Sequence, residues 1–476
     1  MDTAIVWLRR DLRLDDNPAL AAAARRARAV IPVWIHEPDA PRGDGTDWWL
    51  PHSLRDLDRS LRARDSRLML RRGPAMDCLH ALVAETGAGA VYWNRRYEPD
   101  EVQRDRGIFQ SLRESGVEVQ SFRAALLREP WELATGAGTP YRVFTPFWQA
   151  FRRAGEMPAP ISRPSRIPAP ARWPQSEAVE ALDIDRDSTH HRRALGDHWQ
   201  PGESGARTAL ERFLRRGLSH YAGGRDHPAE DGVSRLSPHL HFGELSPARA
   251  WKRVARRMES DPDSREGGEA WLRQLVWREF AHHVLFHFPH TPDQPMYRRW
   301  RHFPWREDHE DLLAAWREGR TGYPIVDAGM RELWETGWMH NRVRMLVASL
   351  LVKNMRVPWQ SGAAWFLETL VDADLANNTL GWQWCAGCGA DAAPYFRIFN
   401  PFTQSRRFDP EGRYIRRWLP ELAALPARYR HAPHEAPESV LADASLRLDH
   451  HYPRPVIDYA DSRREALAAA EKARGR

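Results

Sequence analysis

The chain has 476 residues, of which 42% are hydrophobic and 28% are charged, so it is long enough for two globular domains. Its three cysteines are too few for a disulfide framework or for the four ligands of an iron–sulfur cluster. No apolar run is long enough to span a bilayer, and charges follow the first short apolar stretch at once. We therefore expect a soluble, cytoplasmic protein without a secretory signal.

The first 125 residues alternate short apolar runs with amphipathic stretches. Strands are predicted over residues 4–8, 30–35, 67–70, 90–93 and 117–120, and helices over 17–26, 48–63, 76–86 and 98–115. Such β-α-β alternation predicts a doubly wound, Rossmann-like parallel sheet. Gly87-Ala88-Gly89 precedes a strand instead of opening a helix. This absence of a glycine-rich fingerprint argues against an ordinary nicotinamide site.

Beyond this region the chain first becomes irregular and then helical. Six prolines fall between residues 158 and 174, which indicates a long connector. We predict an α/β domain over 1–128, an interdomain linker over 129–200 and an all-α domain over 201–476. Ser237-Pro238 and Ser246-Pro247 each place a hydroxyl before a proline, a pattern typical of helix N-caps.

Residues 234–237 form a candidate anion site. Ser234, Arg235 and Ser237 lie just ahead of the helix expected at Pro238. Hydroxyls, free backbone N–H groups and a positive helix terminus suit a phosphate or pyrophosphate. A plain N-cap is the alternative interpretation.

The next helix carries a candidate stacking surface. Gln274, Trp277 and Arg278 are spaced i, i+3 and i+4, so they share one face that could bind a nucleobase. The alternative places Trp277 in the core and Arg278 in an ion pair. His283 and His287 have metal-ligand spacing but no third ligand, so ordinary packing is favoured.

A later helix combines polar and apolar residues. Asn341 and Met345 lie one turn apart, and Arg342 and Arg344 flank them. The Asp-x-Asp pair at 372–374 could neutralise these arginines or bind a divalent metal, and an arginine partner is favoured. The C-x-x-C at 385–388 stands alone and is interpreted as incidental.

Together these segments resemble the photolyase/cryptochrome flavoprotein family almost from end to end. The matching motifs are IVWLRRDLRLDDNPAL, WNRRYEP (93–99), TPF (145–147), SRLSPHLHFGELSP, WREF, GYPIVDAGMRELWETGWMHNR, DADLANNTLGWQW and PYFRIFNP. The resemblance implies an α/β domain and an all-α domain that binds FAD. It is strongest to bacterial class I enzymes that split cyclobutane pyrimidine dimers in UV-damaged DNA with blue light.

The resemblance also implies roles for individual residues. Those implied for FAD are Tyr221, Val233, Ser234, Arg235, Leu236, Ser237, Trp271, Arg278, Arg344, Asp372, Ala373, Asp374 and Asn378. Arg344 would pair with Asp372, and Asn378 would face the flavin N5. Those implied for electron transfer are Trp382, Trp359 and Trp305. Those implied for the flipped-out dimer and the DNA strand are Arg225, Gln274, Trp277, Asn341, Arg342, Met345, Trp384 and Gln404.

Single positions distinguish subfamilies. Enzymes for the six-four photoproduct have paired histidines where this chain has His340-Asn341, and cryptochromes of plants and insects have Asp or Cys in place of Asn378. The chain departs from the family at Gln274, where a Glu is frequent, and at Val233, where a Thr is frequent. We expect repair to be retained with a modestly altered yield.

Two matters stay open at this stage. A cryptochrome-like photoreceptor with little repair activity is the alternative function, whereas a nicotinamide-dependent flavin reductase lacks a nucleotide fingerprint. An antenna chromophore, either 5,10-methenyltetrahydrofolate or 8-hydroxy-5-deazaflavin, is also compatible with the sequence. Asp100 and Glu101 lie where folate-binding members place polar contacts. We further expect a monomer, no metal and no membrane partner.

Overall fold

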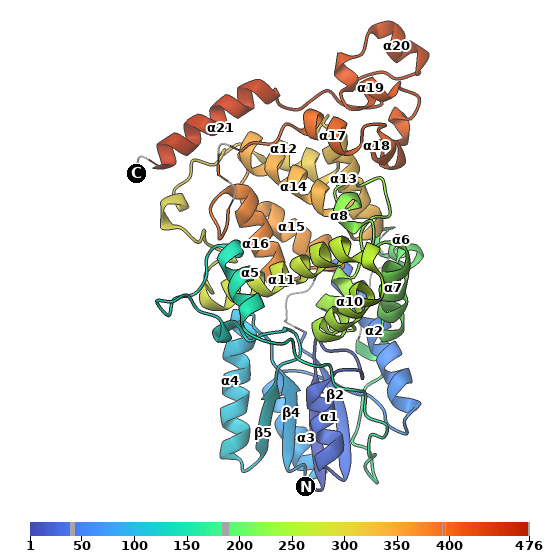
Figure 1. Cartoon of the computed structure of the whole chain (residues 1–476), viewed down its shortest axis with the longest axis vertical. Helices are drawn as coiled ribbons and strands as arrows, with labels where there is room; N and C mark the ends of the chain where they lie inside the picture. Colours follow the sequence, from blue (N-terminus) through green and yellow to red (C-terminus); the bar gives the residue numbers. More distant parts are fainter. Residues whose placement is uncertain (39–42, 183–189, 393, 396, 475–476) are drawn as a thin grey trace. The chain divides into compact units, whose positions relative to one another are not determined.

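The computed structural model describes residues 1–38, 43–182, 190–392, 394–395 and 397–474, which form two compact units (Figure 1). The sheet unit comprises Met1–Ser219, Ser234–Pro289 and Val371–Asp374. The helical unit comprises His220–Val233, His290–Leu370 and Leu375–Arg476. The predicted domain boundaries at 128 and 200 do not coincide with these units, because helices after residue 200 belong to the sheet unit.

Five parallel strands build the sheet in the order β3-β2-β1-β4-β5, which confirms the predicted doubly wound fold. The strands are β1 Thr3–Leu8, β2 Ala29–His36, β3 Met69–Arg72, β4 Ala90–Asn94 and β5 Glu118–Phe122. β3 begins two residues later than predicted. The backbone N–H of Leu68 donates to Asp58 at 2.8 Å instead of to a neighbouring strand, and pairing with β2 starts at Met69.

Helices cover both faces of the sheet (Figure 1). α3 (Ala75–Thr86) and α4 (Pro99–Glu114) bury Leu79 and Ile108 against alternate strand residues such as Trp7. α1 (Pro18–Arg26) buries its alanine-rich surface on the other face, and α2 (Asp44–Arg62) follows β2. Because alternate residues of a strand point to opposite faces, the near-continuous apolar strands fit a sheet covered on both sides.

The predicted linker contains two helices, α5 (Phe144–Arg153) and α6 (His190–His198). In α5, Phe144, Phe147 and Phe151 recur on one face and are buried. Phe144 and Phe147 contact Phe280 of α11. The proline-rich residues 154–179 form no helix or strand.

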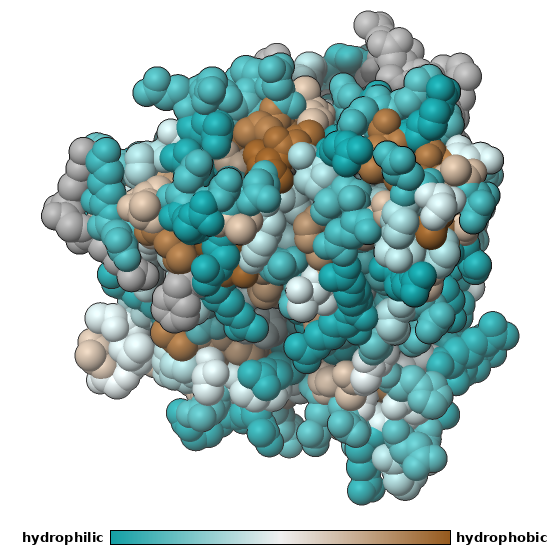
Figure 2. Space-filling model, turned by 90° about the horizontal axis from the view of Figure 1, so that it is seen from above, coloured by the Kyte–Doolittle hydropathy of each residue, from teal (hydrophilic) through white to brown (hydrophobic). Residues whose placement is uncertain are grey.

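The remaining helices of the sheet unit are α7 Glu203–Arg216, α9 Ser237–His241, α10 Pro247–Ser260 and α11 Arg265–His287. Those of the helical unit are α8 Tyr221–Gly224, α12 Glu310–Arg317, α13 Pro324–Thr336, α14 Asn341–Ser349, α15 Trp359–Thr369, α16 Leu375–Ala386, α17 Pro401–Phe408, α18 Arg413–Trp418, α19 Ala427–Arg430, α20 Glu438–Asp443 and α21 Tyr459–Arg474. No described helix is both long and apolar enough to cross a membrane. The face shown in Figure 2 is mostly hydrophilic, with apolar patches between the polar side chains.

A buried amide network joins the carboxyl ends of β1 and β4, where the strand order reverses. The Asn94 side chain donates to Asp11 at 2.6 Å and to Asn17 at 2.8 Å. Asn17 also caps α1 by accepting from the backbone N–H of Leu20 at 3.1 Å. The network therefore fixes the loop after β1 and the start of α1 together.

We predict that Asn17→Ala lowers the free energy of unfolding by about 2–3 kcal/mol. The substitution removes the cap of α1 and one acceptor of the buried Asn94 amide. Asn17→Ser keeps a capping oxygen and should cost less. Urea denaturation of the three proteins measures the difference, and a change below about 0.5 kcal/mol for the alanine variant would contradict the prediction.

Candidate functional site

The residues predicted to form the site occur in both units, and each group is described within its own unit. The sheet unit contains Ser234, Arg235, Leu236, Ser237, Trp271, Gln274, Trp277, Arg278, Asp372, Ala373 and Asp374. The helical unit contains Tyr221, Arg225, Val233, Trp305, Asn341, Arg342, Arg344, Met345, Trp359, Asn378, Trp382, Trp384 and Gln404. The predicted pair consists of Arg344 from the helical unit and Asp372 from the sheet unit, and it stays a prediction.

The loop at 234–237 is held by a contact from α11. The Trp271 indole N–H donates to the Ser234 hydroxyl at 3.1 Å. Arg235 has a φ of 51°, in the left-handed region that non-glycine residues seldom adopt. The predicted Ser237 cap is wrong, because Ser237 lies inside the five-residue α9, after the N-cap Leu236. Ser246 does cap α10, accepting from the N–H of Arg249 at 2.9 Å.

α11 presents Gln274, Trp277 and Arg278 together, as their spacing predicts. All three side chains are half-buried. Trp277 stacks on Phe144 with ring centroids 3.7 Å apart and planes at 7°. Arg278 donates to the carbonyl of Ala125 at 2.7 Å. Phe144 and the Ala125 carbonyl thus contact Trp277 and Arg278, while Gln274, Trp277 and Arg278 each stay partly exposed.

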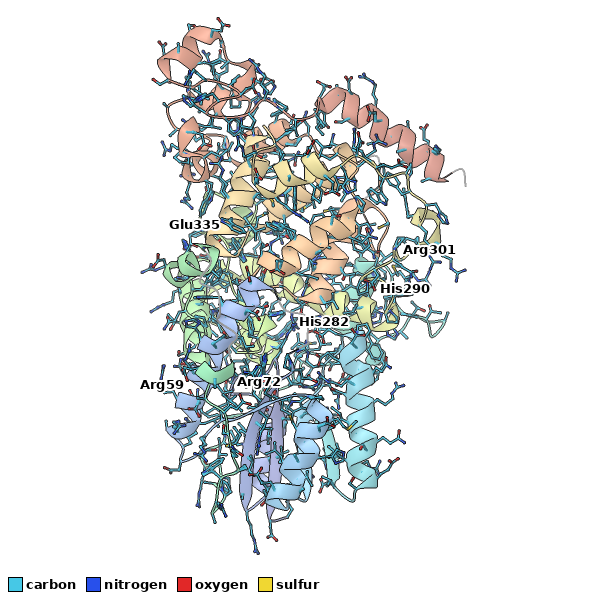
Figure 3. All side chains as sticks on the ribbon, turned by 180° about the vertical axis from the view of Figure 1, so that it is seen from behind. Arg59, Arg72, His282, His290, Arg301 and Glu335 are labelled. Carbon is cyan, nitrogen blue, oxygen red and sulfur yellow. The ribbon has the colours of Figure 1, made fainter. Side chains whose placement is uncertain are left out.

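Asp374 lies in a buried polar cluster of the sheet unit. Its carboxylate is 3.6 Å from Nε2 of His282 and 3.9 Å from Nδ1 of His241 (His282 is labelled in Figure 3). Burial alone would raise the pKa of Asp374, but interactions with His282, Arg278 and His241 lower it to about 2. Burial and Arg10 hold the pKa of His241 well below its ordinary value. Asp374 is therefore ionised among these neighbours, and its closest described contacts are histidine rings.

Glu279 follows Arg278 on α11 and is also buried. Its Oε2 accepts from the N–H groups of Leu127 at 2.9 Å and Arg128 at 3.1 Å. Burial raises the pKa of Glu279 to about 7, against a partial lowering by Arg278 and the two N–H donors.

Two motifs that resemble metal or redox sites have other roles. Nδ1 of His283 is hydrogen-bonded to the carbonyl of Pro130, and Nε2 accepts from the N–H of Tyr141, each at 3.0 Å. His287 contacts the same carbonyl at 3.0 Å. Burial raises the pKa of both Cys385 and Cys388 to about 12, so the thiols stay protonated and unreactive.

In the helical unit, α14 exposes one face of the predicted substrate pocket. Asn341 is exposed, and its Nδ2 lies 4.0 Å from the sulfur of Met345. Arg342 donates to Asp226 at 2.8 Å and lies over the ring of Phe408 at 4.3 Å. Nε of Arg344 donates to the carbonyl of Met339 at 2.8 Å. Asn341, Arg342 and Met345 thus all lie in the N-terminal half of α14.

The predicted electron carriers have close packing in the helical unit. Trp382 on α16 is 2% exposed and contacts Phe366 edge-on, with centroids 5.0 Å apart. Any Cβ at Gly362 of α15 would lie 2.1 Å from the Trp382 ring, so only glycine permits this approach. Trp359, at the start of α15, and Trp305 line one cavity. Nearby on α16, the Asn378 amide donates to the carbonyl of Ala363 at 3.0 Å.

The other predicted residues of this unit surround these elements. Arg225 lies over the Tyr221 ring at 5.7 Å. Val233, Trp384 and Gln404 are half-buried.

Sequence reasoning missed several residues that position the site. Asp226, Phe408, Phe144 and Gly362 are each far in sequence from the side chain they contact. Only Asp226 carried a signal, since it adjoins Arg225, but no spacing indicated its pairing with Arg342.

Comparison with known proteins defines the class of protein. The family model described as DNA photolyase matches residues 4–170, and the FAD binding domain of DNA photolyase matches residues 271–472. A parallel α/β segment followed by a helical FAD-binding segment is thus a two-part flavoprotein. The chain belongs to the DNA photolyase family.

Individual relatives match over the full length. A deoxyribodipyrimidine photo-lyase of Agrobacterium fabrum is 47% identical over 98% of this chain and 97% of its own. Cryptochrome-2 of Arabidopsis thaliana is 39% identical over 98% of this chain and 78% of its own. A crystal structure of a bacterial class III photolyase from Agrobacterium tumefaciens is 44% identical, with a TM-score of 0.96 over 100% of this chain and 98% of its own.

We predict that Glu279 makes the protein less stable as the pH rises. Its raised pKa means that the folded protein binds a proton at Glu279 more tightly than the unfolded chain does. The contribution of Glu279 to the free energy of unfolding is therefore fully present below pH ~4.5 and is lost as the pH rises to ~7. The decline should be at most about 3 kcal/mol.

Chemical denaturation at a series of pH values measures this decline. Glu279→Gln should remove it, because the amide keeps an acceptor for the Leu127 and Arg128 N–H groups but does not titrate. Glu266→Gln, at an exposed position of the same helix, is the control and should leave it in place. Equal pH profiles for wild type and Glu279→Gln would refute the role of Glu279.

Proposed function

We propose that this protein splits cyclobutane pyrimidine dimers in UV-damaged DNA in a light-dependent reaction that uses FAD. The full-length match to a deoxyribodipyrimidine photo-lyase at 47% identity carries the proposal. The half-buried Gln274, Trp277 and Arg278 and the exposed Asn341 support it, since a flipped-out base needs accessible rings and amides.

The residues around the proposed flavin site have suitable chemistry for FAD. Hydroxyls and N–H groups at 234–237 would hold the phosphates. The buried carboxylate of Asp374 stays ionised and can accept hydrogen bonds from a ligand, and Trp271 fixes the Ser234 hydroxyl of the 234–237 loop. When bound, FAD supplies the light-driven electron that opens the dimer, and the protein supplies position and electrostatics. Tyr221, Arg344, Asp372 and Asn378 would complete this site.

Trp382, Trp359 and Trp305 would carry electrons between the flavin and solvent. Trp382 and Trp359 are each 2% exposed, whereas Trp305 is half-buried. This order of exposure suits a path that begins at a buried cofactor and ends where a solution reductant can reach it.

Trp277, Asn341, Met345 and Trp384 would surround the dimer, with Gln274 at its edge. The amide of Gln274 can donate a hydrogen bond to a thymine carbonyl but brings no charge. Arg225, Arg342 and Gln404 would contact the DNA strand, which should make binding depend strongly on salt.

A photoreceptor with little repair activity is the second candidate. The 39% identity to Cryptochrome-2 over nearly the whole chain favours it. Such a protein would retain FAD and the tryptophans without needing a working dimer pocket.

The antenna, the oligomeric state and the location complete the proposal. Either a folate or a deazaflavin chromophore suits it. Glu101, one of the predicted folate contacts, lies 3.5 Å from Arg9 in an ion pair and is half-buried. The proposed protein is a cytoplasmic monomer.

We predict that Asp226→Asn changes DNA binding in two ways. It removes a carboxylate that neutralises Arg342, so affinity for undamaged DNA should rise and the slope of log affinity against log salt should steepen by about 1. It also frees Arg342 from its fixed position, so the preference for dimer-containing DNA should fall.

Fluorescence anisotropy at several salt concentrations measures both effects. Asp461→Asn makes the same charge change at an exposed ion pair with Arg464 and is the control, for which both quantities should stay as in wild type. Equal slopes and preferences for the Asp226 and Asp461 variants would show that the Asp226–Arg342 pair has no role in binding.

A repair assay tests the proposed function. We expect reduced, FAD-loaded protein to restore intact thymines in an oligonucleotide with one dimer under blue light and not in the dark. Gln274→Glu should repair with a changed quantum yield or dimer affinity, because it brings a carboxylate to the dimer edge. Chromatography of the products measures repair. Protein that binds FAD and is photoreduced through Trp382 but repairs nothing would favour the photoreceptor.

A further inference from the structure

A small cavity in the helical unit lies beside two of the proposed electron carriers. Its walls include Trp305 and Trp359 together with Trp300, Phe303, Gln360 and Tyr395. Exposed Arg301 and half-buried Trp305 form part of the same wall, so the cavity reaches solvent (Arg301 is labelled in Figure 3).

Three polar atoms of this wall are buried without a hydrogen-bond partner in the described chain. They are Nε1 of Trp300, Oε1 of Gln360 and the hydroxyl of Tyr395. Buried polar groups are seldom left unpaired, and the cavity has room for about two water molecules. We expect water to bridge these three atoms, since each lacks a protein partner and all line one space.

Aromatic contacts connect Tyr395 to Trp305. The Phe303 ring lies 4.5 Å from the Trp305 ring and 5.4 Å from the Tyr395 ring, measured between centroids. Tyr395 also stacks on Trp300 at 5.4 Å and 21°. One phenyl ring therefore separates the two oxidisable side chains.

We propose that Tyr395 is a further electron donor, which reduces oxidised Trp305 and releases its phenolic proton to water in the cavity. The inference rests on the proposed function, in which Trp305 loses an electron. In the step, the Trp305 radical cation gains one electron from Tyr395, and the Tyr395 O–H bond breaks. The products are neutral Trp305, a neutral tyrosyl radical and a protonated water, so charge and atoms balance.

The surroundings of Tyr395 explain why the proton must leave. Burial raises the pKa of Tyr395, so the side chain is a neutral phenol before it is oxidised. Nζ of Lys353 lies 5.2 Å from the ring and donates to the carbonyl of Arg397 at 3.0 Å. A cation so near disfavours a second positive charge on the ring. Loss of the proton through the water at the hydroxyl avoids that charge.

The role differs from that of a packing residue, because only the hydroxyl is required. Tyr395→Phe keeps the stacking on Trp300 and Phe303 and removes an O–H that has no described protein partner. Tyr429→Phe, at a half-buried tyrosine outside the cavity, is the matched control. Both variants should keep the FAD content, the unfolding midpoint and the dimer repair of chemically reduced protein.

The test is electron paramagnetic resonance of FAD-loaded protein after a light flash, with ring-deuterated tyrosine to identify the radical. We expect a tyrosyl signal in wild type and in Tyr429→Phe, and its loss in Tyr395→Phe, where a tryptophanyl radical remains. Formation of the tyrosyl signal should also slow in deuterated water, which a packing role would not cause.

Two results separate the failure of this inference from that of the proposed function. A tryptophanyl radical that is identical in wild type and Tyr395→Phe overturns the role of Tyr395 and leaves the proposed electron path in place. No flash-induced radical in wild-type protein that holds FAD overturns the role of Tyr395 together with the proposed electron path, whereas no dimer repair by chemically reduced, FAD-loaded protein overturns the proposed function itself.

Discussion

The site depends on α11 satisfying the backbone of a segment that has little regular structure of its own. Apart from the short 3-10 helix at Pro130–Glu132 and the turn between Thr135 and Thr139, residues 124–141 form no helix or strand that could pair their backbone groups, and unpaired buried groups are costly. Polar side chains of α11 supply the partners, through Arg278 at Ala125, Glu279 at Leu127 and Arg128, and His283 at Pro130 and Tyr141. These hydrogen bonds fix one side of α11 and thereby set the directions in which Trp271, Gln274 and Trp277 of the same helix point.

Burial separates the two kinds of work proposed for the helical unit. Trp382 and Trp359 are almost wholly buried, and Gly362 allows Trp382 to contact the backbone of α15. Close packing of this kind holds rings at fixed separations and excludes solvent. Asn341 is instead exposed and Arg342 half-buried, which suits the contact with DNA proposed for them. The proposed electron carriers of this unit are thus more buried than its proposed binding groups.

The sequence predicted those features that arise from local patterns. Apolar runs located all five strands, and helical spacing placed Gln274, Trp277 and Arg278 on one face. Local patterns failed where a contact with a residue outside the pattern sets the boundary of an element. The N–H of Leu68 donates to Asp58, so β3 starts later than its apolar run suggests. Ser237 has the sequence of a cap, yet α9 starts one residue earlier.

Pairings between distant residues were beyond any spacing argument. Asp226, in the segment after α8, meets Arg342 of α14 although the two residues lie 116 apart in sequence. Phe144 reaches Trp277 from a segment predicted to be an irregular linker, and its helix forms there because three phenylalanines bury one face. The motif resemblance supplied the side chains proposed for the site, but it could not name the neighbours that hold them.

Only three of the 70 Lys and Arg residues are lysines (Lys252, Lys353 and Lys472), and two arginines show what this preference means for the structure. Arg342 is bonded at its edge to Asp226 while its plane lies over Phe408, and Arg9 similarly pairs with Asp105 while lying 4.4 Å from the Trp7 ring. A planar guanidinium can do both and stays charged, whereas an ammonium offers no plane. The buried Lys353 shows the contrast, because burial lowers its pKa to about 8. At buried and half-buried positions, arginine thus combines a charged edge that pairs with a carboxylate and a flat face that packs on a ring.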